Sequence, residues 1–219
     1  MVCNNGRVLR PERMDSSDAE TTRRCLKDLR RINRLLGGYR VVVGVMRRLV
    51  SPGERFSVLD VGAASGDVGV ALQKRFKNAV VTSLDRRELH LRLGTGPRVA
   101  ADAFHLPFRP RSFDFVVCSL FLHHFEDAQI TALLAEMRLA ARRAVVAVDL
   151  ERHFLAYYFL PATRPLFRWQ EITVSDGCIS VEAAFRPDEL AALAKAAGAE
   201  KFQVRRHRPW FRLSLVMPA

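Results

Sequence analysis

The stretch VLDVGAASGD at residues 58–67 decides the fold. An apolar run leads into small residues and then into an acidic residue, which is the pattern of a buried strand, a tight turn and the start of a helix. Small side chains let a ligand approach the backbone of such a turn, and the first turn of the following helix offers unpaired N–H groups. The stretch therefore predicts a ligand-binding loop between a strand and a helix.

Short apolar runs alternate with helix-like segments on both sides of this loop. Strands that alternate with helices are typical of βαβ units in a parallel sheet, with a ligand crevice at the carboxyl ends of the strands. A helix opening at Pro187 and two strands around Arg208-Pro209 close the pattern. The strands predicted before them cover residues 56–61, 79–85, 98–101, 113–120 and 144–150.

Two segments flank this alternation. Leucines and an isoleucine at three- and four-residue spacing predict a helix within residues 14–50, interrupted at Gly37-Gly38. Residues 151–186 are rich in aromatic side chains and prolines and break the rhythm of strands and helices. We expect an N-terminal helical arm at residues 1–53 and a domain at residues 54–219 that carries a cap-like insert at about 151–186.

Composition narrows the class of protein. With 49% hydrophobic residues and a mean hydropathy near zero, the chain is expected to be an ordinary globular protein. The four cysteines (Cys3, Cys25, Cys118 and Cys178) lack the spacing of a zinc site or a disulfide framework, so we expect no metal and a reducing, cytoplasmic location. The first thirty residues contain no apolar segment typical of an export signal.

Three carboxylates follow three successive predicted strands and should point into one crevice. Asp60 ends the first strand, Asp85 the second, where it can accept both hydroxyls of a ribose, and Asp102 follows the third, where it can accept an adenine amino group. The turn lacks the GxGxxG spacing of a dinucleotide site, and Asp67 at the helix start would repel a pyrophosphate. A zwitterionic amino-acid tail on a cation is better tolerated there.

The series Asp60-x-Gly62-x-Ala64-x-Gly66 resembles the first motif of the class I S-adenosylmethionine-dependent methyltransferases, with Ala64 in place of the middle glycine. The resemblance covers residues 56–150 by motif. It implies a Rossmann-like α/β fold with a seven-stranded, mostly parallel sheet and helices on both faces. It implies S-adenosylmethionine as cofactor, with the methionine part at the turn, the ribose at Asp85 and the adenine at Asp102. The residues assigned to the cofactor are Asp60, Gly62, Ala63, Ala64, Ser65, Gly66, Asp85, Arg86, Asp102, Ala103, Ser119 and Leu120.

The run FDFVVCSLFLHHF at residues 113–125 is similar to methyltransferases of small molecules and quinones. We expect O-methylation of a small, largely apolar acceptor (phenolic, polyketide or quinone-like) in bacterial secondary metabolism. A histidine suits the proton transfer that such an acceptor needs, and His124 is preferred to His123 as the base, although both could simply pack beside the cofactor. The residues predicted to bind the acceptor are Tyr39, His123, Tyr157, Tyr158 and Trp169.

Three alternatives stay open. A strand, a small-residue turn and an acidic residue also occur in NAD(P)-dependent oxidoreductases. The net charge of +12 could serve an RNA-directed methyltransferase or an RNA-binding module, although the arginines are scattered rather than striped, which makes a nucleic-acid partner the weaker prediction. The arginine-rich face of residues 23–48 could also contact an anionic membrane. The sequence does not indicate an oligomeric state.

Overall fold

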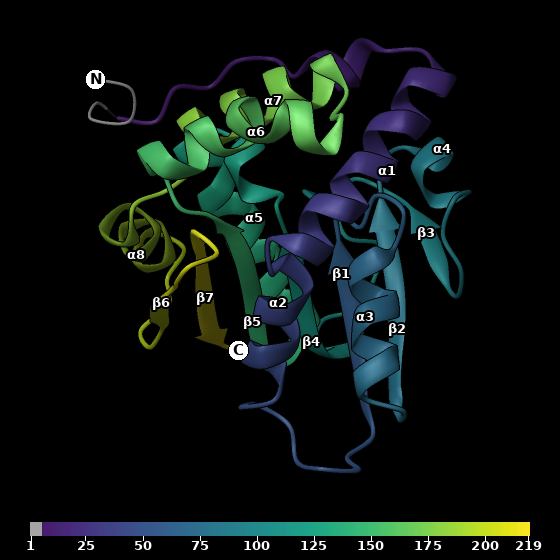
Figure 1. Cartoon of the computed structure of the whole chain (residues 1–219). Coiled ribbons are helices and arrows are strands. Elements are labelled where there is room, and N and C mark those ends of the chain that lie inside the picture. The colour runs from purple at the N-terminus through teal and green to yellow at the C-terminus, as the bar shows by residue number, and fades with distance from the viewer. Residues whose placement is uncertain (1–5) are drawn as a thin grey trace.

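One seven-stranded sheet organises the chain, and the computed structural model describes it from residue 6 to residue 219 (Figure 1). The strand order is β3-β2-β1-β4-β5-β7-β6, and β7 runs antiparallel to its neighbours β5 and β6 while the other pairs are parallel. The strands are β1 (Phe56–Val61), β2 (Ala79–Asp85), β3 (Arg98–Ala100), β4 (Phe113–Ser119), β5 (Ala141–Leu150), β6 (Gln203–His207) and β7 (Arg212–Pro218). The predicted fold class is confirmed.

Helices cover both faces of this sheet. The α-helices are α1 (Ala19–Leu35), α2 (Gly38–Met46), α3 (Asp67–Arg75), α4 (Glu88–Leu91), α5 (Asp127–Ala140), α6 (Phe154–Phe167), α7 (Glu171–Ala183) and α8 (Pro187–Ala196), with 3-10 turns η1 (Arg13–Ser16) and η2 (Leu122–His124). No helix within residues 6–219 is both long and apolar enough to cross a bilayer. Cys25, Cys118 and Cys178 are free thiols, and Cys3 lies outside the described residues.

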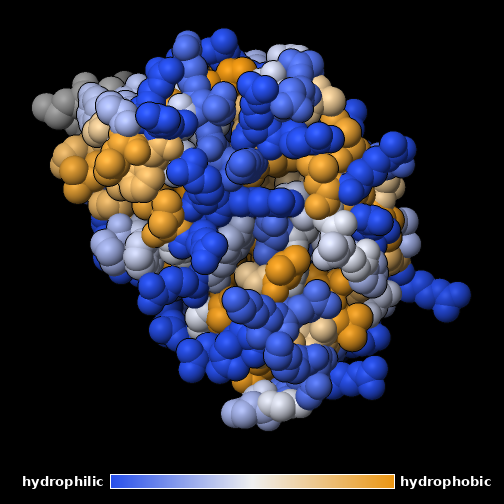
Figure 2. Space-filling model, turned by 45° about the vertical axis from the view of Figure 1, so that its right-hand side comes forward, coloured by the Kyte–Doolittle hydropathy of each residue, from blue (hydrophilic) through white to orange (hydrophobic). Residues whose placement is uncertain are grey.

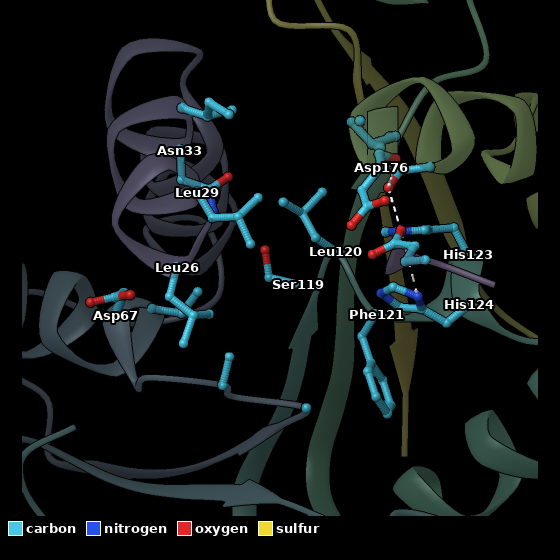
Figure 3. A pocket seen from close by; sticks show the side chains of 18 of the residues that line it. Leu26, Leu29, Asn33, Asp67, Ser119, Leu120, Phe121, His123, His124 and Asp176 are labelled. Atoms are coloured by element: carbon cyan, nitrogen blue, oxygen red, sulfur yellow. Dashed lines mark hydrogen bonds and ion pairs between the residues drawn. The ribbon is translucent and has the colours of Figure 1, made fainter. Parts of the chain in front are cut away.

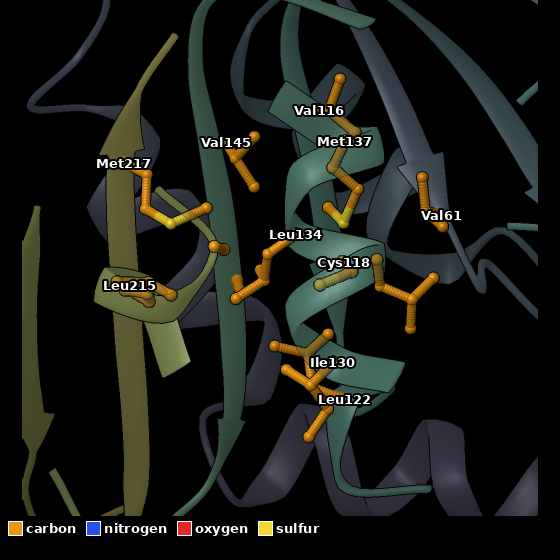
Figure 4. Close-up of a cluster of buried hydrophobic side chains, with 14 of the residues drawn as sticks. Val61, Val116, Cys118, Leu122, Ile130, Leu134, Met137, Val145, Leu215 and Met217 are labelled. Carbon is orange, nitrogen blue, oxygen red and sulfur yellow. The ribbon is translucent and has the colours of Figure 1, made fainter. Parts of the chain in front are cut away.

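The two faces of the sheet carry separate hydrophobic cores. Figure 4 shows the core under α5, where Ile130, Leu134 and Met137 recur on one side of the helix and pack against strand side chains. On the other face, α2 contributes Val42 and Met46 to a core shared with β1, β2 and β5. Apolar residues at helical spacing therefore fix which side of each helix meets the sheet. The predicted boundary at residue 53 between an N-terminal arm and the following domain stays a prediction.

The first helix begins later than residue 14. Asp18 has extended backbone and accepts hydrogen bonds from the N–H groups of Glu20 and Thr21, so it caps α1 at its N-terminus. Gly37, in the left-handed conformation (φ 69°), separates α1 from α2, as the glycine pair predicts. The start of the helix is thus set by a capping carboxylate that apolar spacing alone does not reveal.

The segment predicted as a cap folds into two helices, α6 and α7 (Figure 1). Pro161 and Pro165 lie inside α6, although prolines in a sequence usually indicate turns or the ends of helices. A proline in a helix removes an N–H donor and crowds the preceding turn, so such positions depend on packing for their helical conformation. The cap helices lie with α1 and the N-terminal segment above the carboxyl ends of the parallel strands.

Candidate functional site

A cavity of about 1000 Å³ lies at the carboxyl ends of β1, β2 and β4 (Figure 3). Parallel α/β sheets bind ligands at this edge, where the strand order reverses around β1 and β4. Helix α1 faces the cavity with Leu26 and Leu29, and the loop after β4 faces it from the opposite side. The volume is at the upper end of the range of small-molecule and cofactor sites.

The turn after β1 is shaped for close approach to the backbone. Gly62 has φ 67°, and a Cβ at this position would collide with the ring of Phe121. Ala64 also adopts a left-handed conformation (φ 45°), and its N–H donates to the carboxylate of Asp85 at 2.8 Å. Left-handed backbone at a residue other than glycine costs on the order of 1 kcal/mol or more and is held by its surroundings.

Asp60 is a buried carboxylate with spare hydrogen-bonding capacity. Its side chain is 1% exposed, and its Oδ2 has no hydrogen-bond partner among the described residues. The pKa of Asp60 is raised to about 7, mainly by burial and to a smaller extent by the charges of Asp67 and Asp85, while a hydrogen bond from the N–H of Gly69 opposes the rise. A carboxylate in this state favours a cationic ligand in the cavity, because a positive charge would lower its pKa and stabilise its ionised form.

The other two predicted carboxylates lie on the same cavity. Burial raises the pKa of Asp85, but hydrogen bonds from His90, Arg87 and Ala64 outweigh burial and leave that pKa below its ordinary value. Asp85 is therefore an anion that also fixes the turn after β1. The half-exposed Asp102 accepts the N–H of Phe104 at 3.0 Å.

A second polar group lies on the wall opposite α1 (Figure 3). His123 is 3% exposed, and its Nδ1 lies 2.6 Å from Oδ1 of Asp149. Glu12 reaches the pair from the N-terminal segment, with Oε1 3.8 Å from Nε2 of His123 and 3.8 Å from Nδ1 of His124. Burial lowers the pKa of His123, but the charge and hydrogen bond of Asp149, followed by those of Glu12, raise it to about 9.

Most of the predicted site residues come together on this cavity. Its lining includes Tyr39, Asp60, Gly62, Ala63, Ala64, Ser65, Asp85, Arg86, Asp102, Ala103, Ser119, Leu120, His123 and His124. Gly66 lies just behind the turn as the N-terminal cap of α3.

Tyr157, Tyr158 and Trp169 lie outside this lining. Tyr158 is 54% exposed, while Trp169 is buried, stacks on Phe167 and donates its N–H to the hydroxyl of Thr163. Helix α6 turns a different side to the cavity, with Ala156, Phe159 and Leu160 at helical spacing.

Three polar residues of this site were not predicted from the sequence: Glu12, Asp149 and Asp176. Asp149 ends a predicted strand, so the rule that selected Asp60 and Asp85 applies to it as well. Glu12 precedes the first helix in a segment without periodicity, and Asp176 lies inside α7, where it accepts the N–H groups of Arg13 and Met14. No pattern in the sequence signals these two contacts.

Comparisons with known proteins agree with this geometry. Residues 58–144 match the family model of a methyltransferase domain. A demethylmenaquinone methyltransferase from Thermotoga maritima is 32% identical over 99 residues, which are 43% of this chain and 42% of that protein. The chain thus matches less than half of the length of this curated relative. Residues 58–144 thus carry an S-adenosylmethionine-dependent methyltransferase domain.

Solved structures of methyltransferases share the fold of this methyltransferase domain. The plantazolicin methyltransferase BpumL in complex with SAH superposes with a TM-score of 0.64 at 13% identity, covering 85% of this chain and 84% of that one. Magnesium protoporphyrin IX methyltransferase from Synechocystis PCC 6803 with bound SAH has a TM-score of 0.59 at 16% identity, covering 92% and 99%. At these identities the likeness establishes the fold.

The cavity of the methyltransferase domain fits S-adenosylmethionine, the methyl donor of this family. The donor is a cation with a zwitterionic tail, and the unpartnered oxygen of Asp60 is an acceptor for such a group. The ring of Phe121 packs where a Cβ of residue 62 would lie, so glycine is needed at this turn, and Gly62, Ala63 and Ala64 present the backbone of the turn to the cavity. The assignment of Asp60 to the methionine part, Asp85 to the ribose and Asp102 with Ala103 to the adenine stays a prediction.

Proposed function

We propose that this chain transfers a methyl group from S-adenosylmethionine to a hydroxyl oxygen of a small, largely apolar acceptor. The observation that carries the proposal is that one cavity joins the unpartnered Oδ2 atom of Asp60 to a histidine pair across an apolar space. The apolar side chains that line this space include Leu26, Leu29, Ile32, Leu36, Phe159, Leu160 and Val181. A largely apolar acceptor complements such walls.

Alignment is the main task of the protein in such a reaction. S-adenosylmethionine supplies a methyl group on a sulfonium sulfur, and this sulfur is a leaving group that needs no acid. Holding two reactants in line is worth on the order of 7 to 11 kcal/mol of the barrier. Asp60, Asp85 and Asp102 orient one reactant, while the apolar walls from α1, α6 and α7 orient the other and exclude water.

The hydroxyl group of the acceptor must lose its proton, and this proton transfer takes place at the wall of the cavity formed by His123 and His124. His124 is the more accessible of the two, with its side chain 34% exposed against 4% for His123. The role of His124 or His123 as a free base stays a prediction. The names of the relatives, which include a demethylmenaquinone and a porphyrin methyltransferase, support a ring-bearing acceptor.

Donor binding tests the proposal most directly. In calorimetry, S-adenosylmethionine and S-adenosylhomocysteine are expected to bind, whereas NAD is not. Asp85→Asn should weaken the binding of both ligands by tenfold or more, because it removes a partly buried anion that also holds the turn at Ala64. Asp114→Asn, on β4 beside Ser57 and outside the cavity lining, is the control and should leave the affinity unchanged. Binding of NAD in place of both would favour an oxidoreductase.

A lipid-like acceptor would also need access from a membrane, and we propose that the cap contacts an anionic bilayer. Phe154, Leu155, Tyr158 and Leu166 of α6 are 50% to 77% exposed, in a chain with a net charge of +12. Figure 2 shows apolar side chains grouped between hydrophilic ones on one face of the molecule. The predicted arginine-rich face adds exposed Arg23, Arg34 and Arg47.

Co-sedimentation with vesicles that contain an anionic phospholipid measures this contact. The protein is expected to pellet with anionic vesicles and to stay in solution with neutral ones. Leu166→Glu should reduce the bound fraction several-fold, since it puts a charge on the apolar face of α6. Leu139→Glu, at a leucine of α5 that is 61% exposed, is the matched control and should bind as the unmodified chain does. Equal losses in both variants would exclude the cap as the contact.

A further inference from the structure

We propose that Glu12, His123 and His124 hold a divalent transition metal ion, with zinc as the ion the ligands favour, at the acceptor end of the cavity. Each residue offers one ligand atom, and these atoms all lie within 4.8 Å of one another. The Oε1 atom of Glu12 is 3.8 Å from a nitrogen of each histidine. Ligands at about 2.0 to 2.2 Å from a tetrahedral zinc ion lie about 3.4 Å apart, so Glu12 must approach each histidine by about 0.4 Å and the two histidines must approach each other by at most about 1.4 Å.

The groups behind these ligands are those that metal sites use. His123 turns its second nitrogen to the buried carboxylate of Asp149 at 2.6 Å, which fixes the ring and leaves Nε2 toward Glu12. Glu12 in turn accepts the hydroxyl of Ser180 at 2.5 Å. Metal-binding histidines almost always donate their other N–H to a carboxylate, carbonyl or water, and ligating carboxylates are hydrogen-bonded as well.

The N-terminal segment is anchored so that Glu12 keeps this position. The backbone N–H groups of Arg13 and Met14 donate to Asp176 of α7 at 3.0 and 2.9 Å. On the other side of Glu12, the guanidinium of Arg7 donates to the carbonyl oxygens of Phe125 and Ala183 at 2.9 and 2.8 Å. The carboxylate is therefore delivered to the histidines by a fixed backbone, as a preorganised ligand must be.

The type of ligand selects the class of ion. Two imidazole nitrogens and one carboxylate suit zinc and neighbouring transition ions, whereas magnesium and calcium prefer sites built from oxygen alone. Two histidines and a glutamate are also the protein ligands of several catalytic zinc sites, which keep a further position open. All three residues line the cavity, so the open position would face the acceptor.

The role of the ion rests on the proposed function. A hydroxyl oxygen of the acceptor that binds the ion loses its proton to water more readily, because the metal stabilises the resulting anion. That oxygen then forms the bond to the methyl carbon, while the sulfur–carbon bond breaks and leaves its electron pair on sulfur. The histidines would thus activate the acceptor as ligands and not as free bases.

Zinc content tests the site without an activity assay. Untagged protein of residues 1–219 is stripped with a chelator, incubated with zinc chloride and desalted, and its metal is then measured by mass spectrometry. About one equivalent of zinc should remain on the unmodified chain. His124→Gln and Glu12→Gln, which change the two more accessible ligands, should each lower the zinc affinity by tenfold or more. His207→Gln, at a histidine of the edge strand β6 that contacts Ser214 of β7, should retain the ion.

Two results would overturn the site: no zinc retained by the unmodified chain, or equal retention by the His124→Gln and His207→Gln variants. Donor affinity, measured in parallel on the stripped protein, separates this outcome from failure of the proposed function. A chain that binds S-adenosylmethionine but no zinc would refute the metal site alone. A chain that binds zinc but no donor would refute the proposed function and leave the site standing.

Discussion

Asp149→Ala is expected to lower the melting temperature of the ligand-free protein by about 6 to 20 °C. Asp149 is 1% exposed and accepts four hydrogen bonds, from the side chain of His123 and from the N–H groups of Phe121, Leu122 and Leu150. Removing one partner of a buried ion pair typically costs about 3 to 5 kcal/mol, because the other charge is left uncompensated. For a chain of this length each kcal/mol shifts the melting temperature by about 2 to 4 °C.

Asp149→Asn separates the charge from the backbone contacts. The amide keeps the shape of the side chain and one oxygen for the N–H groups of Phe121 and Leu122, while the charge beside His123 is lost. We expect about half of the loss caused by alanine, measured by calorimetric unfolding. If Asp149→Ala lowered the melting temperature no more than Asp149→Asn does, the hydrogen bonds of this side chain to the backbone would not be what holds the loop after β4 to β5.

The sequence predicts the sheet well because its signals are local. Residues 58–67 combine a buried strand, a turn that requires left-handed backbone and a helix start, and the strands at residues 79–85 and 113–119 follow the same alternation. Parallel strands end at one edge, so Asp60 and Asp85 had to meet there. These residues need only the periodicity of their own segments to be placed.

The acceptor end of the cavity is harder to predict, since it depends on contacts between distant segments. Glu12 and His123 are 111 positions apart in the sequence, and no sequence pattern indicates that the two residues lie close together in the fold. The aromatic residues of α6 show a second limit. Phe159 faces the cavity and Tyr158 faces solvent because of their positions around the helix α6. The two prolines inside this segment argue against a helix in the sequence, so these positions could not be predicted.

Asp60→Asn is expected to make the ligand-free protein more stable at pH 8 and to weaken the binding of S-adenosylmethionine by tenfold or more. In the folded chain the pKa of Asp60 is raised from 3.8 to about 7, mainly by burial. The folded state therefore keeps a proton that the unfolded chain releases near pH 4, and stability falls as the pH rises from about 4 to 7. At about 1.4 kcal/mol for each pKa unit, the ionised carboxylate costs on the order of 4 kcal/mol above pH 7.

The pH dependence distinguishes this cost from a general effect of the substitution. The melting temperature of Asp60→Asn should exceed that of the unmodified chain at pH 8, and the difference should shrink as the pH falls toward 5. Asp114→Asn, whose carboxylate has a lowered pKa through hydrogen bonds from Ser57, should show the opposite sign and be less stable at pH 8. A cationic donor compensates the charge of Asp60, so S-adenosylmethionine should stabilise the unmodified chain strongly and the Asp60→Asn variant little. If S-adenosylmethionine raised the melting temperature of the Asp60→Asn variant as strongly as that of the unmodified chain, Asp60 would not belong to the donor site. Its charge would then contribute nothing to the binding of the donor.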